Sequence, residues 1–83
     1  MIYTHEALQQ RIKTLLMSLC KDENLVLDSQ LDLFAAGLLD SFGVISFISS
    51  LEQTFNLKMA AEEFTMENFK NIHNVALLIE RLS

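Results

Sequence analysis

The stretch from residue 44 to residue 55 constrains the fold most strongly, because its apolar residues recur at the spacing of a single helical face. Residues three and four positions apart lie on one side of an α-helix, so this stripe must be buried against other parts of the chain. Its members are Val44, Phe47, Ile48, Leu51 and Phe55. The pattern predicts a helix that ends near Asn56, a residue that tolerates the left-handed conformation common at helix ends.

Two further stretches carry the same periodicity. The apolar stripes are Leu8, Ile12, Leu15, Leu16 and Leu19 within a helix from about Thr4 to Cys20, and Ile72, Val75, Ala76, Ile79 and Leu82 within a helix from about Ile72 to Leu82. Thr4 and Asn71 are suited to cap the two N-termini. One or two short helical turns are expected between residues 57 and 69, and no strand pattern alternates along the chain. We therefore predict an all-α fold, with one domain over residues 1–83 built as a small bundle of three main helices plus one short helix.

Residues 21–39 show no sustained period, yet they are too apolar for a free linker. We expect a long loop between helices one and two that lies across the bundle, because a connection of this length is uncommon unless it packs or functions. Its apolar residues are Leu25, Leu27, Leu31, Leu33, Phe34 and Leu38. Asp28 and Asp32 lack the ligand spacing of a calcium loop, so they are predicted to cap turns. Gly37 is expected to take a conformation that a side chain would resist.

The loop meets the second helix at the motif GLLDSFG, residues 37–43. We expect Ser41 in the first turn of this helix with its hydroxyl exposed, and either Asp40 or Ser41 itself as the cap. The first N–H groups of a helix lack partners and the helix dipole places positive charge there, which favours a nearby phosphate by roughly 0.3–1 kcal/mol. The junction is therefore suited to carry a phosphodiester.

With Leu33 and Phe34 before it and residues 51–55 after it, GLLDSFG resembles the acyl and peptidyl carrier proteins, and most closely the small free-standing D-alanyl carriers. The resemblance covers nearly the whole chain and implies an acyl-carrier-protein-like bundle. In that family the serine of the Asp-Ser pair receives 4′-phosphopantetheine from coenzyme A, and the thiol of this arm carries an acyl group as a thioester. By position, Ser41 is then the attachment residue, and Asp40 is the neighbour that helps the modifying transferase and its metal.

An apolar surface beside Ser41 is expected to bind partner enzymes. Phe42 and Ile45 lie one helical turn apart and largely off the buried stripe. The predicted docking residues are Leu39, Phe42, Ile45, Ser46 and Ser49. Many carriers place acidic residues along this face, whereas here none occurs before Glu52. We therefore expect docking that is more apolar and more selective for one partner enzyme.

The charge, hydropathy and cysteine content of the chain limit which partners and which cellular compartment are expected. A net charge of −5 argues against nucleic acid, because binding a phosphate backbone requires clustered Lys and Arg. No apolar run approaches the roughly 20 residues of a membrane span, and residues 1–10 lack the features of a signal peptide. The single cysteine excludes an intramolecular disulfide and suits a reducing compartment. We expect a monomeric cytoplasmic protein.

Two other functions compete with the carrier interpretation. As the nucleophile of an enzyme, Ser41 would need a base and an oxyanion hole, and Leu39 replaces the first glycine of the hydrolase elbow. His5 and His73 are the available imidazoles; we expect His5 at the surface and His73 in the first turn of the last helix. The second alternative is an unmodified helical protein–protein interaction module.

Sulfur-containing and aromatic residues are assigned to the core. Cys20 is expected to be a buried or half-buried hydrophobe at the end of the first helix. Met17, Met59 and Met66 are expected to fill core space, as are Phe47, Phe55 and Phe64. This assignment leaves Ser41 as the reactive group of interest.

These patterns favour a non-catalytic carrier whose arm on Ser41 presents a thioester to successive enzymes. The partners that the resemblance implies are a phosphopantetheinyl transferase, a loading enzyme that is an adenylating ligase or an acyltransferase, and a downstream acceptor or condensing enzyme. A tether of this kind speeds reactions by proximity and needs no acid or base of its own. The carried group stays open among fatty acyl, aminoacyl such as D-alanyl, polyketide and aryl groups.

Overall fold

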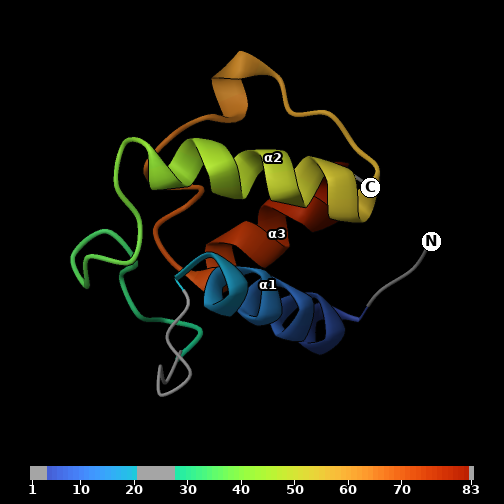
Figure 1. The fold of residues 1–83 in the computed structure, drawn as a ribbon. Helices are drawn as coiled ribbons and strands as arrows, with labels where there is room; N and C mark the ends of the chain where they lie inside the picture. The colour runs from blue at the N-terminus through green and yellow to red at the C-terminus, as the bar shows by residue number, and fades with distance from the viewer. Residues whose placement is uncertain (1–3, 21–27, 83) are drawn as a thin grey trace.

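The computed structural model describes residues 4–20 and 28–82, except for the side chain of Cys20. It contains the helices α1 (His5–Cys20), α2 (Gly43–Phe55) and α3 (Ile72–Leu82), together with the short 3-10 helix η1 (Ala61–Glu63). Figure 1 shows α1 and α2 running in opposite directions, with α3 between them in this view. The predicted all-α bundle is confirmed, and the described part of the chain contains no strand.

The helix ends coincide with the predicted capping residues. Thr4 Oγ1 accepts a hydrogen bond from Ala7 N–H at 3.1 Å, and Asn71 Oδ1 accepts one from Asn74 N–H at 2.7 Å. Each bond satisfies a donor that a helix N-terminus leaves without an intrahelical partner. Asn56 ends α2 in the left-handed conformation, with φ 53° and ψ 53°. These local signals fix where the helices start and stop.

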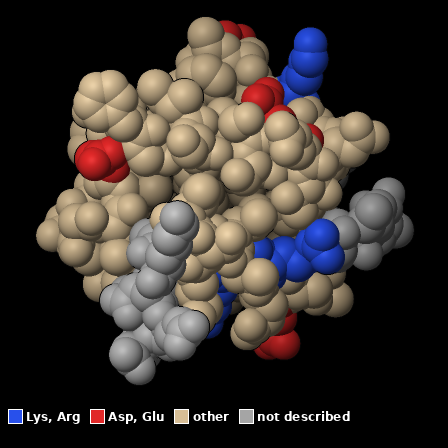
Figure 2. All heavy atoms as spheres, viewed as in Figure 1, with Lys and Arg blue, Asp and Glu red and all other residues tan. Residues whose placement is uncertain are grey.

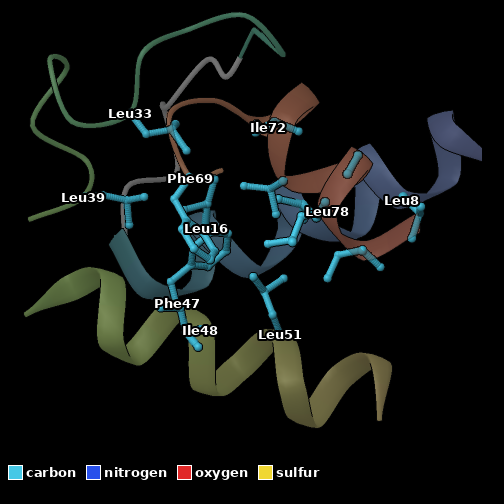
Figure 3. Packing of buried hydrophobic residues seen from close by; sticks show 14 of the residues in the cluster. Leu8, Leu16, Leu33, Leu39, Phe47, Ile48, Leu51, Phe69, Ile72 and Leu78 are labelled. Atoms are coloured by element: carbon cyan, nitrogen blue, oxygen red, sulfur yellow. The ribbon is translucent and has the colours of Figure 1, made fainter. Parts of the chain in front are cut away.

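The core lies where the apolar stripes of the three helices meet. From α2, the side chains of Phe47, Ile48 and Leu51 are buried, and those of Phe47 and Leu51 point toward the other two helices (Figure 3). Phe47 also meets Phe69 edge to face, with 6.4 Å between ring centroids, an arrangement worth about 0.5–1.5 kcal/mol beyond the burial itself. The helix that follows Ser41 is therefore held firmly on the bundle.

The described part of the long connection packs on the bundle as predicted. Leu33 is fully buried, and its N–H donates a hydrogen bond to the Lys70 carbonyl at 2.7 Å. The Ser29 carbonyl accepts a bond from His73 N–H at 3.0 Å. Both bonds join the loop to the start of α3. The expectations for Leu25 and Leu27 lie outside the described residues.

Asp28 and Asp32 cap turns, as the sequence predicts. Asp28 Oδ1 accepts a bond from Gln30 N–H at 2.8 Å, and Asp32 Oδ1 accepts bonds from the N–H groups two and three residues later, at 3.1 and 3.0 Å. Gly37 has a φ of +77°, so the expected conformation is observed. The loop thus has a defined path into α2.

Four side chains expected to be buried are exposed, so that expectation was wrong for them. Met17 is 38% exposed, Leu19 40%, Phe64 50% and Met66 70%, whereas Met59 is buried as expected. Phe64 and Met66 follow η1, and this single turn is too short to present a continuous apolar face to the core. The expectation for Cys20 concerns a side chain outside the described part.

The two faces of α2 predict different effects for the same substitution. Phe47→Ala should lower the free energy of unfolding by about 3–5 kcal/mol, because it leaves a cavity in the core. Phe42→Ala, at a side chain that is 82% exposed, should change it by no more than about 0.5 kcal/mol. Urea denaturation followed by circular dichroism measures both. Equal losses in the two variants would contradict the described orientation of α2.

Candidate functional site

The turn before α2 is held by Asp40. Its Oδ1 accepts hydrogen bonds from Phe42 N–H at 3.0 Å and from Gly43 N–H at 2.6 Å. Its main-chain carbonyl accepts a third, from Val44 N–H at 2.9 Å. Of the two caps that the sequence allowed, Asp40 is the one observed, and it orders the backbone on both sides of Ser41.

Ser41 is exposed on this turn, as predicted. It does not lie in the first helical turn, because α2 begins two residues later, at Gly43. The reason lies in the backbone bonds: Ile45 N–H donates to the Phe42 carbonyl at 3.2 Å, a shorter-range bond than the regular helical one to Ser41. The regular series of bonds is interrupted after the one from Val44 N–H to the Asp40 carbonyl, and Ser41 lies on the capped turn just before α2.

The capping bonds also change what surrounds a phosphate on Ser41. The sequence predicted free N–H groups at the helix start as the favourable environment. Those of Phe42, Gly43 and Val44 already donate to Asp40. A phosphate on Ser41 would therefore lie near a carboxylate, and these three N–H groups are not free to donate to it. Two negative groups in this position favour a cation between them.

Gly43 is a site residue that sequence reasoning missed. A Cβ added there would lie 3.1 Å from Asp40 Oδ1, closer than side chains usually approach. The glycine thus permits the short bond between its own N–H and the Asp40 carboxylate. The sequence signal for this role is the glycine itself. Glycine is unfavourable inside a helix, so its presence at the start of one suggests that a side chain would not fit there.

An apolar cavity of about 320 Å³ opens beside Ser41. Its lining consists of Phe34, Ser41, Val44, Ile48, Phe64, Thr65, Met66 and Phe69. Only Ser41 and Thr65 among these are polar, and none is a histidine or a carboxylate. The cavity offers space beside the hydroxyl but no base to activate it.

The two histidines are engaged elsewhere. His5 Nε2 lies 3.1 Å from His73 Nδ1, and His5 Nδ1 lies 3.0 Å from Glu80 Oε1. Both rings therefore sit at the contact between α1 and α3, and neither lines the cavity beside Ser41. Both side chains are partly buried. His5 was expected at the surface, and His73 lies in the first turn of α3 as expected. Nothing in this arrangement supports a serine hydrolase.

Four of the five predicted docking residues are exposed. Phe42 is 82% exposed and Ile45 64%, and Ser46 and Ser49 are also exposed. Leu39 is a correction, since it is only 4% exposed and belongs to the core. Its N–H donates to the carbonyl of buried Leu33 at 3.1 Å, which turns its side chain inward. Figure 2, in the view of Figure 1, shows a surface made mostly of uncharged residues.

Comparison with known families agrees with this geometry. Residues 10–79 match the family described as "Phosphopantetheine attachment site". The chain belongs to this family. The prosthetic group of this family is covalently bound 4′-phosphopantetheine. An exposed serine on an ordered turn, with an open cavity beside it, fits such a group.

Relatives of this carrier are found among D-alanyl carrier proteins. Those of Streptococcus pyogenes serotype M5 (strain Manfredo) and serotype M1 are each 39% identical to it over 51 residues. The matched region covers 61% of this chain and 65% of each relative, slightly less than two thirds of their length. None of the helices described in this carrier is long and apolar enough to cross a membrane.

The Asp40 cap predicts a difference between two substitutions. Asp40→Ala should lower the free energy of unfolding by about 0.5–2 kcal/mol, because the N–H groups of Phe42 and Gly43 lose their acceptor. Asp40→Asn should retain most of the stability, since asparagine caps about as well. Urea midpoints of the two variants and the wild type test this. An alanine variant as stable as the wild type would contradict the capping role.

Proposed function

We propose that Ser41 is the attachment residue and that this carrier presents an acyl or aminoacyl group as a thioester at the end of its arm. The observation that supports this most directly is the exposed hydroxyl of Ser41 on a turn ordered by Asp40. The turn is anchored through α2 to the core, so the attachment point is fixed while the arm beyond it is free. An enzyme can reach such a hydroxyl without unfolding the carrier.

Attachment requires Ser41 Oγ to attack the phosphorus that bears the pantetheine part of coenzyme A. An O–P bond forms, the bond from that phosphorus to the adenosine bisphosphate breaks, and the serine proton passes to a base. The cavity beside Ser41 contains no such base among its lining residues. Asp40 Oδ1 already accepts two N–H bonds. We therefore assign the base to the transferase.

Asp40 is proposed to assist through its charge. Its Oδ1 is committed to the turn, which leaves Oδ2 as the oxygen that can face a cation of the transferase. Hard divalent cations bind carboxylate and phosphate oxygens. A cation held there would offset the repulsion between Asp40 and the phosphates of coenzyme A. Capping and metal support are thus assigned to different oxygens of one side chain.

The bound arm supplies a thiol to which the acyl group is attached. The carrier contributes position: a tether raises the local concentration of the acyl group at the active site of each partner. We propose as partners a phosphopantetheinyl transferase, a loading ligase or acyltransferase, and a downstream acceptor or condensing enzyme. Because the relatives are named D-alanyl carriers, D-alanine is the first carried group to test.

Intact mass spectrometry tests the attachment site. After incubation with coenzyme A and a promiscuous transferase, the wild type should gain the mass of one phosphopantetheine and Ser41→Ala should gain none. Ser18→Ala, at an exposed serine of α1, is a matched control and should be modified like the wild type. A wild type without mass gain would favour an unmodified interaction module instead.

The two roles of Asp40 can be separated by kinetics. Asp40→Asn keeps a capping oxygen but loses the charge, so it should be stable yet slow in phosphopantetheine transfer. We expect kcat/KM to fall by roughly 10–100-fold, the usual cost of removing a group that supports a bound metal. Transfer rates at several magnesium concentrations measure this effect. A variant that is modified at the wild-type rate would leave Asp40 with the capping role alone.

A further inference from the structure

We propose that His5 and His73 bind one zinc ion at the contact between α1 and α3. Two of their ring nitrogens face each other, and a carboxylate lies behind one of the rings. Neither histidine lines the cavity beside Ser41. The zinc site is therefore separate from the proposed attachment site and does not depend on the arm.

The two helices place four polar side chains together. His5 and Gln9 are four residues apart on α1, and these residues share one side of that helix. His73 and Glu80 are seven residues apart on α3 and likewise share one side. The Nδ1 of His5 lies 3.0 Å from Glu80 Oε1. Its Nε2 lies 2.9 Å from Gln9 Nε2 and 3.1 Å from His73 Nδ1.

These contacts determine which nitrogen of His5 can bind a metal ion. An ionised carboxylate only accepts hydrogen bonds, so His5 Nδ1 carries the hydrogen that is donated to Glu80. In the neutral ring, Nε2 then has a free lone pair, which faces Gln9 and His73. Histidines that bind metals usually donate their second N–H to a carboxylate or carbonyl in this way, because that bond orients the ring.

The distance between the two facing nitrogens suits a single ion. Zinc binds histidine nitrogens at about 2.0–2.1 Å, so two nitrogens on a tetrahedral zinc ion lie roughly 3.3 Å apart. His5 Nε2 and His73 Nδ1 are 3.1 Å apart, and a small movement of the side chains would admit the ion. The ring planes cross at 72° with 4.9 Å between centroids. The rings thus meet at an angle, as two imidazoles bound to one ion do.

Zinc would replace the hydrogen bond between the rings. Each facing nitrogen donates its lone pair to the ion, and no bond within either ring breaks. The hydrogen on His73 Nδ1 passes to water while Nε2 of the same ring takes one from water, so no net proton is released. Imidazole nitrogens select zinc over magnesium and calcium, which prefer oxygen ligands.

The remaining zinc ligands are an amide and water. In the described part of the chain, no group of three or more His, Cys, Asp and Glu residues could hold a metal ion. Turning the Gln9 amide by half a rotation brings its oxygen to the position that its nitrogen now holds beside His5. Water reaches the site, since the side chains of His5 and Glu80 are 33% and 37% exposed. We therefore expect an open site from which zinc exchanges.

Titration of zinc chloride into the untagged full chain tests the site. The chain carries Cys20→Ser and Ser41→Ala, which remove the cysteine thiol and the arm thiol as competing soft ligands. At free zinc about five times Kd, Tm should rise by about 4–8 °C, because zinc binds the folded state. Magnesium should leave Tm unchanged. Nitrogen-15 NMR of the imidazoles should assign the bound atoms to His5 Nε2 and His73 Nδ1.

Substitutions separate the ligand from the residue that orients it. His73→Ala removes one ligand and should weaken zinc binding at least about tenfold. Glu80→Gln keeps both imidazoles but loses the carboxylate behind His5, so binding should weaken by about 10–100-fold. Glu67→Gln is the matched control, since Glu67 is an exposed carboxylate that lines a cavity together with Glu80. Its zinc affinity should equal that of the parent chain, and circular dichroism without zinc confirms that each variant is folded.

Three outcomes would overturn the zinc site. The first is a Tm that zinc does not raise, and the second is a folded His73→Ala variant that binds zinc as tightly as the parent. The third is a zinc-dependent dimer in sedimentation, which would place the ion between two chains. A Glu80→Gln variant that behaves like Glu67→Gln would remove the orienting role of Glu80. None of these results bears on Ser41, whose modification is measured separately by intact mass.

Discussion

The carboxylate of Asp40 provides the constraint on which the site depends. A helix start leaves backbone N–H groups that need acceptors, and one oxygen of Asp40 accepts from two of them, those of Phe42 and Gly43. These two bonds form a tight turn in which Ser41, between Asp40 and Phe42, is exposed. The bond to Gly43, at 2.6 Å, leaves little room for a Cβ. One side chain thus determines the shape of the turn, the exposure of the hydroxyl and the need for a glycine.

The turn is useful because α2 fixes it to the rest of the molecule. Phe47, Ile48 and Leu51 are buried on one side of this helix, while Phe42 and Ile45 face solvent near its start. The buried and the exposed apolar side chains therefore lie on different faces of α2. Under the proposed function, the carrier holds the attachment point still, and the partner enzymes supply the acids, bases and metal.

The features predictable from the sequence were those set by neighbouring residues. Periodicity located the helices, and Thr4, Asn71, Asn56 and Asp40 act at their ends through bonds that span only a few residues. The features that were missed depend on the path of the chain in three dimensions. Leu39 is drawn inward by a bond to Leu33, and Phe64 and Met66 are exposed because a single turn precedes them. No local pattern distinguishes these from core residues.

The central claim is that Ser41 carries the prosthetic group in the living cell. Tandem mass spectrometry of proteolytic peptides, from carrier purified out of its own cells without added transferase, tests this most directly. The account predicts that the pantetheine fragment is released from the peptide that contains Ser41, with the modified bond assigned to that serine. A phosphopantetheine group on Ser46, Ser49 or any other residue would contradict it.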